Sequence, residues 1–100
     1  MFNFSKALRN GTLLKTQTAK LMFTPKVKGY NTHIGYGMDI DLRYNQNIQG
    51  HSGGWYGIHC ELMDFMKDEY TVVILSNIDD GGKTGTSKVA DFFKGLIADK

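Results

Sequence analysis

The chain has 100 residues, of which 41% are hydrophobic and 12% aromatic, and its formal net charge at pH 7 is +2. This length fits one small domain, expected over residues 1–100, and the composition is not that of a disordered chain. The lysines are scattered without a basic stripe, so nucleic acid is not predicted as a partner. No apolar run approaches the roughly 20 residues of a membrane span. The N-terminus lacks the basic start and apolar core of a signal peptide.

Two short helices are predicted at the N-terminal end. Residues 2–10 have apolar side chains at helical spacing. Thr16 can cap a second helix over 17–23, and Pro25 would stop it, since the residue before a proline avoids helical backbone. Residues 26–33 are expected to form a loop.

From residue 34 the hydrophobic period changes to two, which is typical of strands. Strands are predicted at residues 34–44, 48–53, 58–66 and 70–77. The last of these is apolar on both faces, so it is expected at the centre of the sheet with both faces covered. Cys60, on the third strand, has apolar neighbours and is expected to be buried.

The tail of the chain, residues 87–100, has the pattern of an amphipathic helix. Its apolar stripe consists of Val89, Phe92, Phe93, Leu96 and Ile97. Such a stripe is expected to pack against the sheet. The predicted fold class is therefore α+β: an antiparallel sheet of about four strands in meander order, packed by a C-terminal helix, with two short N-terminal helices.

The segment 81–88, GGKTGTSK, precedes the predicted C-terminal helix and contains Lys83-Thr84-Gly85, a triplet known from penicillin-recognising enzymes. Its position in a loop favours coincidence. It does not fit the P-loop pattern either, because Asn77 stands where the first glycine is required. Two interpretations stay open: an anion site at the helix N-terminus, and a connector capped by Thr86 or Ser87.

The sequence predicts no metal and no cofactor. The candidate metal ligands of softer character are His33, His51, His59 and Cys60. Their spacing matches neither a His-Glu-x-x-His motif nor a pair of cysteines.

The segment 50–57, GHSGGWYG, holds four glycines. Glycine weakens the interior of a strand, so glycines at these positions need a physical reason. One interpretation is a bulged connection between two strands, shaped by Gly53, Gly54 and Gly57. The other is a site where the backbone comes close to a ligand.

Several segments occur in an order that resembles a known family. They are NFSKALRNGTLLKTQTAKLMFTPK, GYGMDID, GHSGGWYG and YTVVILSNID, and with the last helix they cover nearly the whole chain. Together they resemble the C-terminal portion of the serine beta-lactamase-like hydrolases, which include class C beta-lactamases, D-alanyl-D-alanine carboxypeptidases and related esterases. The resemblance implies a part of a longer fold that hydrolyses an acyl substrate through a serine ester.

The resemblance places His51-Ser52-Gly53 at the family's His-x-Gly triplet, on the strand that borders the active site. It implies that His51, Ser52 and Gly53 bind substrate, and that side chains of this strand hydrogen-bond the substrate carboxylate or tune the catalytic network. The backbone N–H of Gly54 would be one of the two donors of the oxyanion hole. Trp55 and Tyr56 would flank the mouth of the cleft and contact the substrate.

The family's Ser-x-x-Lys and Tyr-x-Asn motifs are missing from the sequence. The chain is therefore expected to be inactive by itself, with the N-terminal remainder of the parent fold and a small-molecule acyl substrate as partners. The parent would be periplasmic or secreted, and the localisation of this chain is left open. The alternatives are a standalone module that binds a carboxylate or peptide along residues 51–56, and a homodimer through an open sheet edge.

Overall fold

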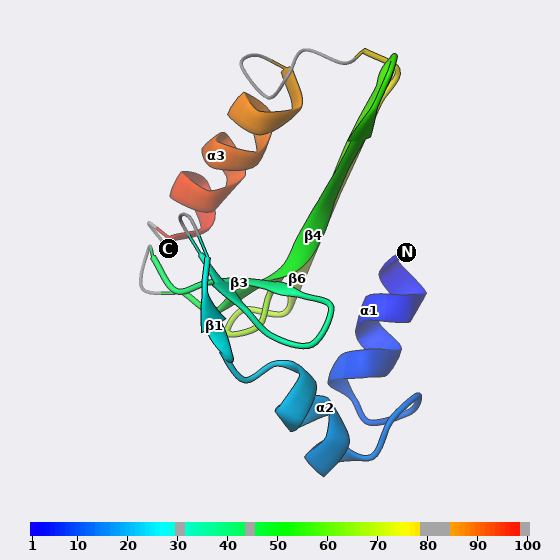
Figure 1. The fold of residues 1–100 in the computed structure, drawn as a ribbon, viewed down its shortest axis with the longest axis vertical. Helices are drawn as coiled ribbons and strands as arrows, with labels where there is room; N and C mark the ends of the chain where they lie inside the picture. The colour runs from blue at the N-terminus through cyan, green and yellow to red at the C-terminus, as the bar shows by residue number, and fades with distance from the viewer. Residues whose placement is uncertain (30–31, 44–45, 79–84, 99–100) are drawn as a thin grey trace.

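The computed structural model describes residues 1–29, 32–43, 46–78 and 85–98, which form an α+β fold (Figure 1). The helices are α1 (Phe2–Arg9), α2 (Thr16–Met22) and α3 (Gly85–Ala98). The strands are β1 (Val27–Lys28), β2 (His33–Ile34), β3 (Asp39–Asp41), β4 (Ile48–Trp55), β5 (Ile58–Phe65) and β6 (Tyr70–Ser76). They pair in an antiparallel sheet with the order β1-β2-β3-β4-β5-β6. The predicted fold class and meander order are therefore confirmed.

Both N-terminal helices form where the sequence predicts them. After α1, the chain turns at Gly11, which has a φ of +80°. Helix α2 begins at Thr16 itself and follows Lys15, whose extended backbone occupies the N-cap position without a side-chain cap. The predicted capping role of Thr16 is therefore wrong, because this residue already lies in the first helical turn.

The first half of the sheet contains more and shorter strands than predicted. Residues 26–33, expected as a loop, contain β1 and the first residue of β2. The expected strand 34–44 is broken by a tight turn, in which the N–H of Gly35 donates to the carbonyl of Met38 at 2.9 Å. Gly37 in this turn has a φ of +74°. One periodic segment thus forms parts of two strands, and the sheet has six strands instead of about four.

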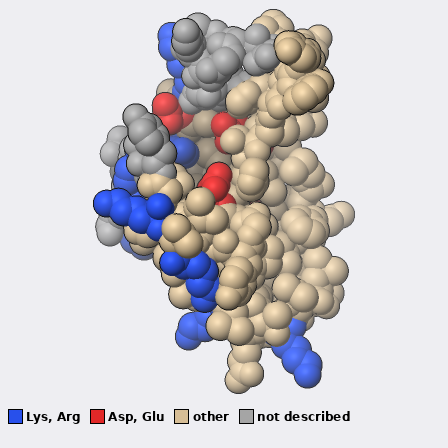
Figure 2. All heavy atoms as spheres, in the orientation of Figure 1, with Lys and Arg blue, Asp and Glu red and all other residues tan. Residues whose placement is uncertain are grey.

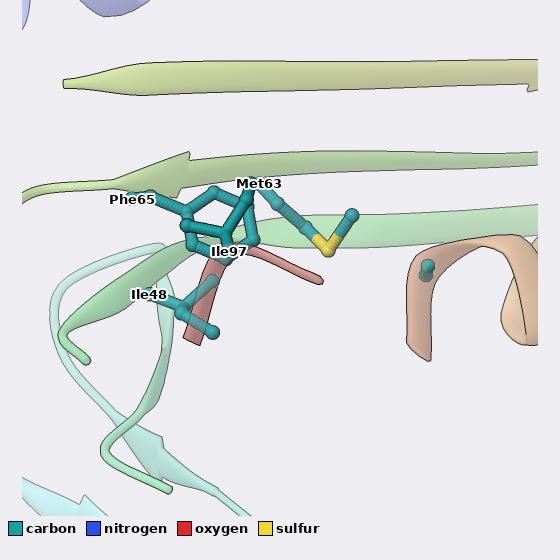
Figure 3. Packing of buried hydrophobic residues seen from close by; sticks show 5 residues of the cluster. Ile48, Met63, Phe65 and Ile97 are labelled. Carbon is teal, nitrogen blue, oxygen red and sulfur yellow. The ribbon is translucent and has the colours of Figure 1, made fainter. Parts of the chain in front are cut away.

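Helices α1 and α3 lie on opposite sides of the long strands β4, β5 and β6 (Figure 1). We call these sides the α1 face and the α3 face. Because directly paired residues of antiparallel strands share a face, the register assigns each side chain of the hairpin to one of them. The hydrophobic core lies on the α3 face and contains Ile48, Met63, Phe65, Ala90 and Ile97 (Figure 3).

On the α1 face, Arg9 ties α1 to the sheet. Its Nη1 lies 3.4 Å from Oδ1 of Asp64 and donates to the hydroxyl of Thr71 at 3.1 Å. The hydroxyl of Thr71 in turn donates to the same oxygen of Asp64 at 2.6 Å. Asp64 is buried, so this network supplies the partners that a buried carboxylate requires.

Strand β6 is not the central strand that its apolar sequence predicts. It lies at the end of the sheet order, and Leu75 on its α1 face is 74% exposed. The other face holds Val72 and Ile74, which pack against the core beneath α3. The prediction was wrong because an apolar sequence on both faces of a strand does not determine whether other elements cover both faces, or whether the strand has a pairing partner on each side.

The apolar stripe of α3 is only partly packed on the sheet. Ile97 is buried and Phe93 is partly buried in the core. In contrast, Val89, Phe92 and Leu96 are 41%, 64% and 52% exposed. The stripe is wider than the contact that a flat sheet makes with one side of a helix, so the prediction that the whole stripe packs there is wrong.

Candidate functional site

The segment GHSGGWYG forms β4 from Gly50 onward and the turn into β5. The pairing is one-to-one from Ile48↔Phe65 to Trp55↔Ile58, so the strands form a regular hairpin. The turn consists of Tyr56 and Gly57, and Gly57 has a φ of +75°, which explains the glycine. The predicted bulge is therefore wrong, because the glycines of β4 keep the regular register.

Gly50 marks a close approach between the two strands of the hairpin. A Cβ atom at this position would overlap the carbonyl oxygen of Leu62 and lie 2.7 Å from its carbonyl carbon. Real Cβ atoms do not approach backbone so closely. Only glycine fits here without a shift of the backbone, so the first glycine of the segment has a structural role.

Beyond Gly50, the outer edge of β4 has no strand neighbour within the described residues. Strand β3 pairs with only Ile48–Gly50, while β4 continues to Trp55. The candidate residues from His51 onward thus lie along an open strand edge, with β5 on the other side.

The backbone groups that face this edge belong to Ser52 and Gly54. Next to the hairpin, the N–H of Met66 donates to the carbonyl of Asn47 at 3.0 Å, so this pair is hydrogen-bonded. Hydrogen-bonded and open pairs alternate along an antiparallel ladder. The even-numbered residues of β4 therefore direct N–H and C=O away from β5. The N–H predicted as an oxyanion donor, that of Gly54, points to the open side.

The register separates the candidate side chains between the two faces. His51, Gly53 and Trp55 belong to the α1 face, whereas Ser52 and Gly54 belong to the α3 face. The imidazole of His51 donates from Nδ1 to the backbone carbonyl of Ser52. This contact holds the ring against the open edge of β4.

On the α3 face, two residues of β5 lie opposite the candidate site. Glu61 pairs with Ser52, and His59 pairs with Gly54. Nε2 of His59 lies 3.5 Å from Oε1 of Glu61, and both side chains are largely buried. A Cβ at Gly54 would come within 3.2 Å of Nδ1 of His59, so the missing side chain leaves room for this ring.

A cavity of about 190 Å³ lies beside Ser52, and we call it the Ser52 hollow. Its charged lining residues are Asp39, Asp41, Glu61 and Lys94, and His51 and Ser52 join them from β4. Acidic side chains gather around a hollow in this view of the surface (Figure 2). Carboxylates therefore outnumber ammonium groups in the lining.

Asp41 is the most strongly bound of these carboxylates. Burial by itself would raise the pKa of Asp41, but the hydrogen bonds from Arg43 and the charges of Lys94 and Arg43 outweigh it and lower this pKa. The guanidinium of Arg43 donates to both carboxylate oxygens, at 2.9 and 2.8 Å. Nζ of Lys94 lies 3.4 Å from Oδ2. Asp41 therefore stays ionised at neutral pH and engages the charge of Lys94.

The aromatic residues of the segment lie at the tip of the hairpin and do not line the Ser52 hollow. Trp55 and Tyr56 are 71% and 86% exposed. Their ring centroids are 5.5 Å apart in an edge-to-face arrangement. They extend the open edge of β4 with apolar surface but contribute no charge or ordered polar contact to the hollow.

A second and mainly apolar hollow, of about 390 Å³, lies closer to the tip of the hairpin than the Ser52 hollow does. Gly53 and Gly54 line it together with Cys60 and Leu75. Cys60 is half-buried, so the expectation of a buried thiol is wrong. The reason is that Gly53, which pairs with Cys60, supplies no side chain to cover the sulfur.

The residues of the Ser52 hollow that come from other elements were not predicted from the sequence; they are Asp39, Asp41, Glu61 and Lys94. The alternation of Asp39 and Asp41 showed a polar strand face, and a turn at Tyr56-Gly57 would have paired Ser52 with Glu61. These two patterns would have been enough to predict the contributions of β3 and β5 to the hollow.

Most of the Lys83-Thr84-Gly85 triplet precedes α3 in the sequence. Lys83 and Thr84 lie outside the described residues, as do the side chains of Thr86 and Ser87. Within the described part of the chain, no group of three or more His, Cys, Asp or Glu side chains is arranged to hold a metal ion. None of the described helices has the length and apolar character needed to cross a membrane.

No sequence profile of a known protein family matches the chain, and comparison with curated protein sequences gives no match either.

Proposed function

We propose that this chain forms one wall of the acyl-transfer site of a serine hydrolase of the beta-lactamase-like type, with Gly54 as an oxyanion donor. The observation that carries the proposal is the open edge of β4, where the N–H of Gly54 points away from β5. A developing oxyanion needs N–H donors aimed at the position it will occupy. The nucleophile would come from outside this chain.

The absence of side chains around this N–H supports the proposal. Gly53 and Gly54 carry no side chain, so an acyl group can approach the backbone at this point. His51 lies next to the same edge through its bond to the carbonyl of Ser52. In the proposal, this imidazole contacts a polar group of the substrate.

The charges of the Ser52 hollow narrow the class of substrate. Asp39 and Glu61 line it, and Lys94 is engaged by Asp41. An anionic group in this hollow would meet like charges at short range, which disfavours binding. We therefore expect the leaving-group side of the substrate to be neutral or cationic there, as in an ester or an amine-bearing peptide.

The proposal is tested by following backbone amide shifts of the chain at millimolar ligand. The ligands are a short amino ester and a peptide that ends in D-Ala-D-Ala. The expected result is a shift of the Gly54 amide with the amino ester that exceeds the shift with the peptide carboxylate.

Two variants distinguish the role of the Gly54 N–H from the effect of adding a side chain at this position. Gly54→Pro removes the N–H, and proline is tolerated at an open strand edge. Gly54→Ala keeps the N–H and adds a similar carbon beside His59. Binding should be lost in the proline variant and kept in the alanine variant. Equal binding by both variants, or no shift at Gly54 with either ligand, would rule out the donor role.

A further inference from the structure

Strand β6 presents a regular and uncharged sheet edge. The sheet order ends at β6, so no strand pairs with its outer side within the described residues. Its sequence, YTVVILS, carries no charge, and its register with β5 is one-to-one throughout. Charges and bulges are the usual devices that prevent an edge strand from pairing with another chain. β6 has neither of them.

The backbone groups that face this edge belong to Thr71, Val73 and Leu75. In the β4–β5 ladder the odd-numbered residues of β5 turn away from β4 and toward β6. Their partners in β6 are the even-numbered residues. The N–H and C=O groups of the three odd-numbered residues therefore point outward, in position to pair with an added strand.

Exposed side chains of α3 lie beside the same edge. Nζ of Lys94 lies 3.4 Å from the Asp41 carboxylate of β3, so one flank of α3 faces β3. Each residue rotates a helix by about 100°, which places Val89, Phe92 and Leu96 on the opposite flank, toward β6. We call these three residues the α3 stripe, and they are 41%, 64% and 52% exposed.

The middle of the α3 stripe lies near the middle of β6. Phe93, Leu96 and Ile97 line one hollow with residues 70–72, so the C-terminal half of α3 covers the first half of β6. The helix then runs back toward the other end of the strand. A single two-fold axis near Val73 can therefore relate both the strand and the helix to a second copy.

The dimensions of such a pair agree with ordinary packing. Two β6 strands would lie about 4.8 Å apart. Because α3 packs over both β5 and β6, its axis would lie about 5 Å from the two-fold axis. The two α3 helices would then be about 10 Å apart, which is the separation of packed helices. In this antiparallel arrangement Val89 of one copy faces Leu96 of the other.

We infer that a second copy of this chain binds the outer edge of β6, antiparallel and two-fold symmetric. The two sheets join into one, and the two α3 stripes pack against each other over the junction. The exposed apolar side chains of the stripe gain a partner, and the outward backbone groups of β6 gain hydrogen bonds. This inference goes beyond the proposed function, because it concerns the outer edge of β6 and not the open edge of β4.

Sedimentation equilibrium of the full chain over a wide concentration range tests the inference. The expected result is a mass that rises from one copy to two as concentration increases. Phe92→Lys, in the α3 stripe, and Leu75→Lys, on the edge strand, should each raise the dimer dissociation constant by roughly tenfold or more. Both side chains are exposed, at 64% and 74%, so the folded monomer should tolerate these changes.

Leu21→Lys is the matched control, since Leu21 lies on α2 and is 57% exposed. It should leave the dissociation constant unchanged, and circular dichroism should show all three variants folded. Hydrogen exchange supplies a second measurement: the amides of Thr71, Val73 and Leu75 should become more protected with concentration.

Three outcomes would overturn the inference. The first is a single-copy mass at every concentration, and the second is an equal loss of association in the Leu21→Lys control. The third is protection of the β6 amides in a sample that stays monomeric. That last result would show that another segment covers this edge.

Discussion

Nζ of Lys94 in α3 lies 3.4 Å from Oδ2 of Asp41 in β3. This contact joins the C-terminal helix to the short strands at the start of the sheet. Asp41 is also bound by Arg43, and its side chain is only 5% exposed. One buried carboxylate thus links an element near the middle of the chain to the last helix. The same residue lines the Ser52 hollow.

The lowered pKa of Asp41 predicts how stability depends on pH. Its folded-state pKa lies below the usual value of 3.8, so the folded state binds the proton less well than the unfolded state. The contribution of Asp41 is therefore present above pH 3.8 and is lost as the pH falls through the folded-state pKa. In urea unfolding, the midpoint urea concentration of the unsubstituted chain should fall more steeply than that of Asp41→Asn as the pH is lowered into this range. Parallel curves for the two proteins would contradict the assignment.

Substitution of Arg9 should loosen α1 from the sheet. Arg9→Met removes the cation from the buried Asp64, whose side chain is 8% exposed, and also a donor to Thr71. A buried carboxylate without its cation costs about 3 kcal/mol. Urea unfolding measures the loss. Lys6→Met, at an exposed position on the same helix, should change stability by less than about 0.5 kcal/mol. Similar losses in both variants would point to helix propensity as the cause.

The close approach at Gly50 predicts a strong effect of one added methyl group. In Gly50→Ala the new Cβ would meet the carbonyl group of Leu62, which is backbone and cannot move aside. We expect a loss of about 3 kcal/mol in the free energy of unfolding. Gly95→Ala is the comparison, since a Cβ there meets no atom within 4 Å. That helical position should gain about 0.5–1 kcal/mol. A tolerated Gly50→Ala would mean that β4 and β5 can move apart at low cost.

The chain alone should not hydrolyse acyl substrates, because the proposed donor only stabilises charge on the substrate's carbonyl oxygen, and the proposal takes the nucleophile from outside this chain. A p-nitrophenyl ester and a chromogenic beta-lactam should react with the chain no faster than with buffer. If turnover occurs, Ser52→Ala and His51→Ala show whether the candidate site causes it. Turnover that depends on Ser52 would assign the nucleophile to this chain and change the proposal.

Patterns between neighbouring residues were sufficient to predict the helices and strand β5. Helical spacing in residues 2–10 and alternation in 58–66 depend on side chains that are close in sequence, and both elements form there. The break between β2 and β3 was missed because the turn at Gly37 lies inside the periodic segment 34–44. Its alternation continues through a change in chain direction.

The place of β6 and the lining of the Ser52 hollow could not be predicted in this way. Both depend on the packing of distant segments: Lys94 reaches Asp41 only after α3 has packed on the sheet. Composition shows that Val73 and Leu75 are apolar, but not that β6 ends the sheet order. The direction of the Gly54 N–H likewise depends on which pairs of the ladder are hydrogen-bonded.

The fit of Gly50 against Leu62 also fixes the alignment of the hairpin. If β4 slipped by one residue, Gln49 or His51 would lie opposite Met63, where the carbonyl of Leu62 leaves no room for a side chain. A slip of two residues would bring in Ile48 or Ser52 with the same overlap. Glycine at this point therefore excludes the neighbouring alignments. It thereby determines that Ser52, and not His51, lies on the α3 face beside Glu61.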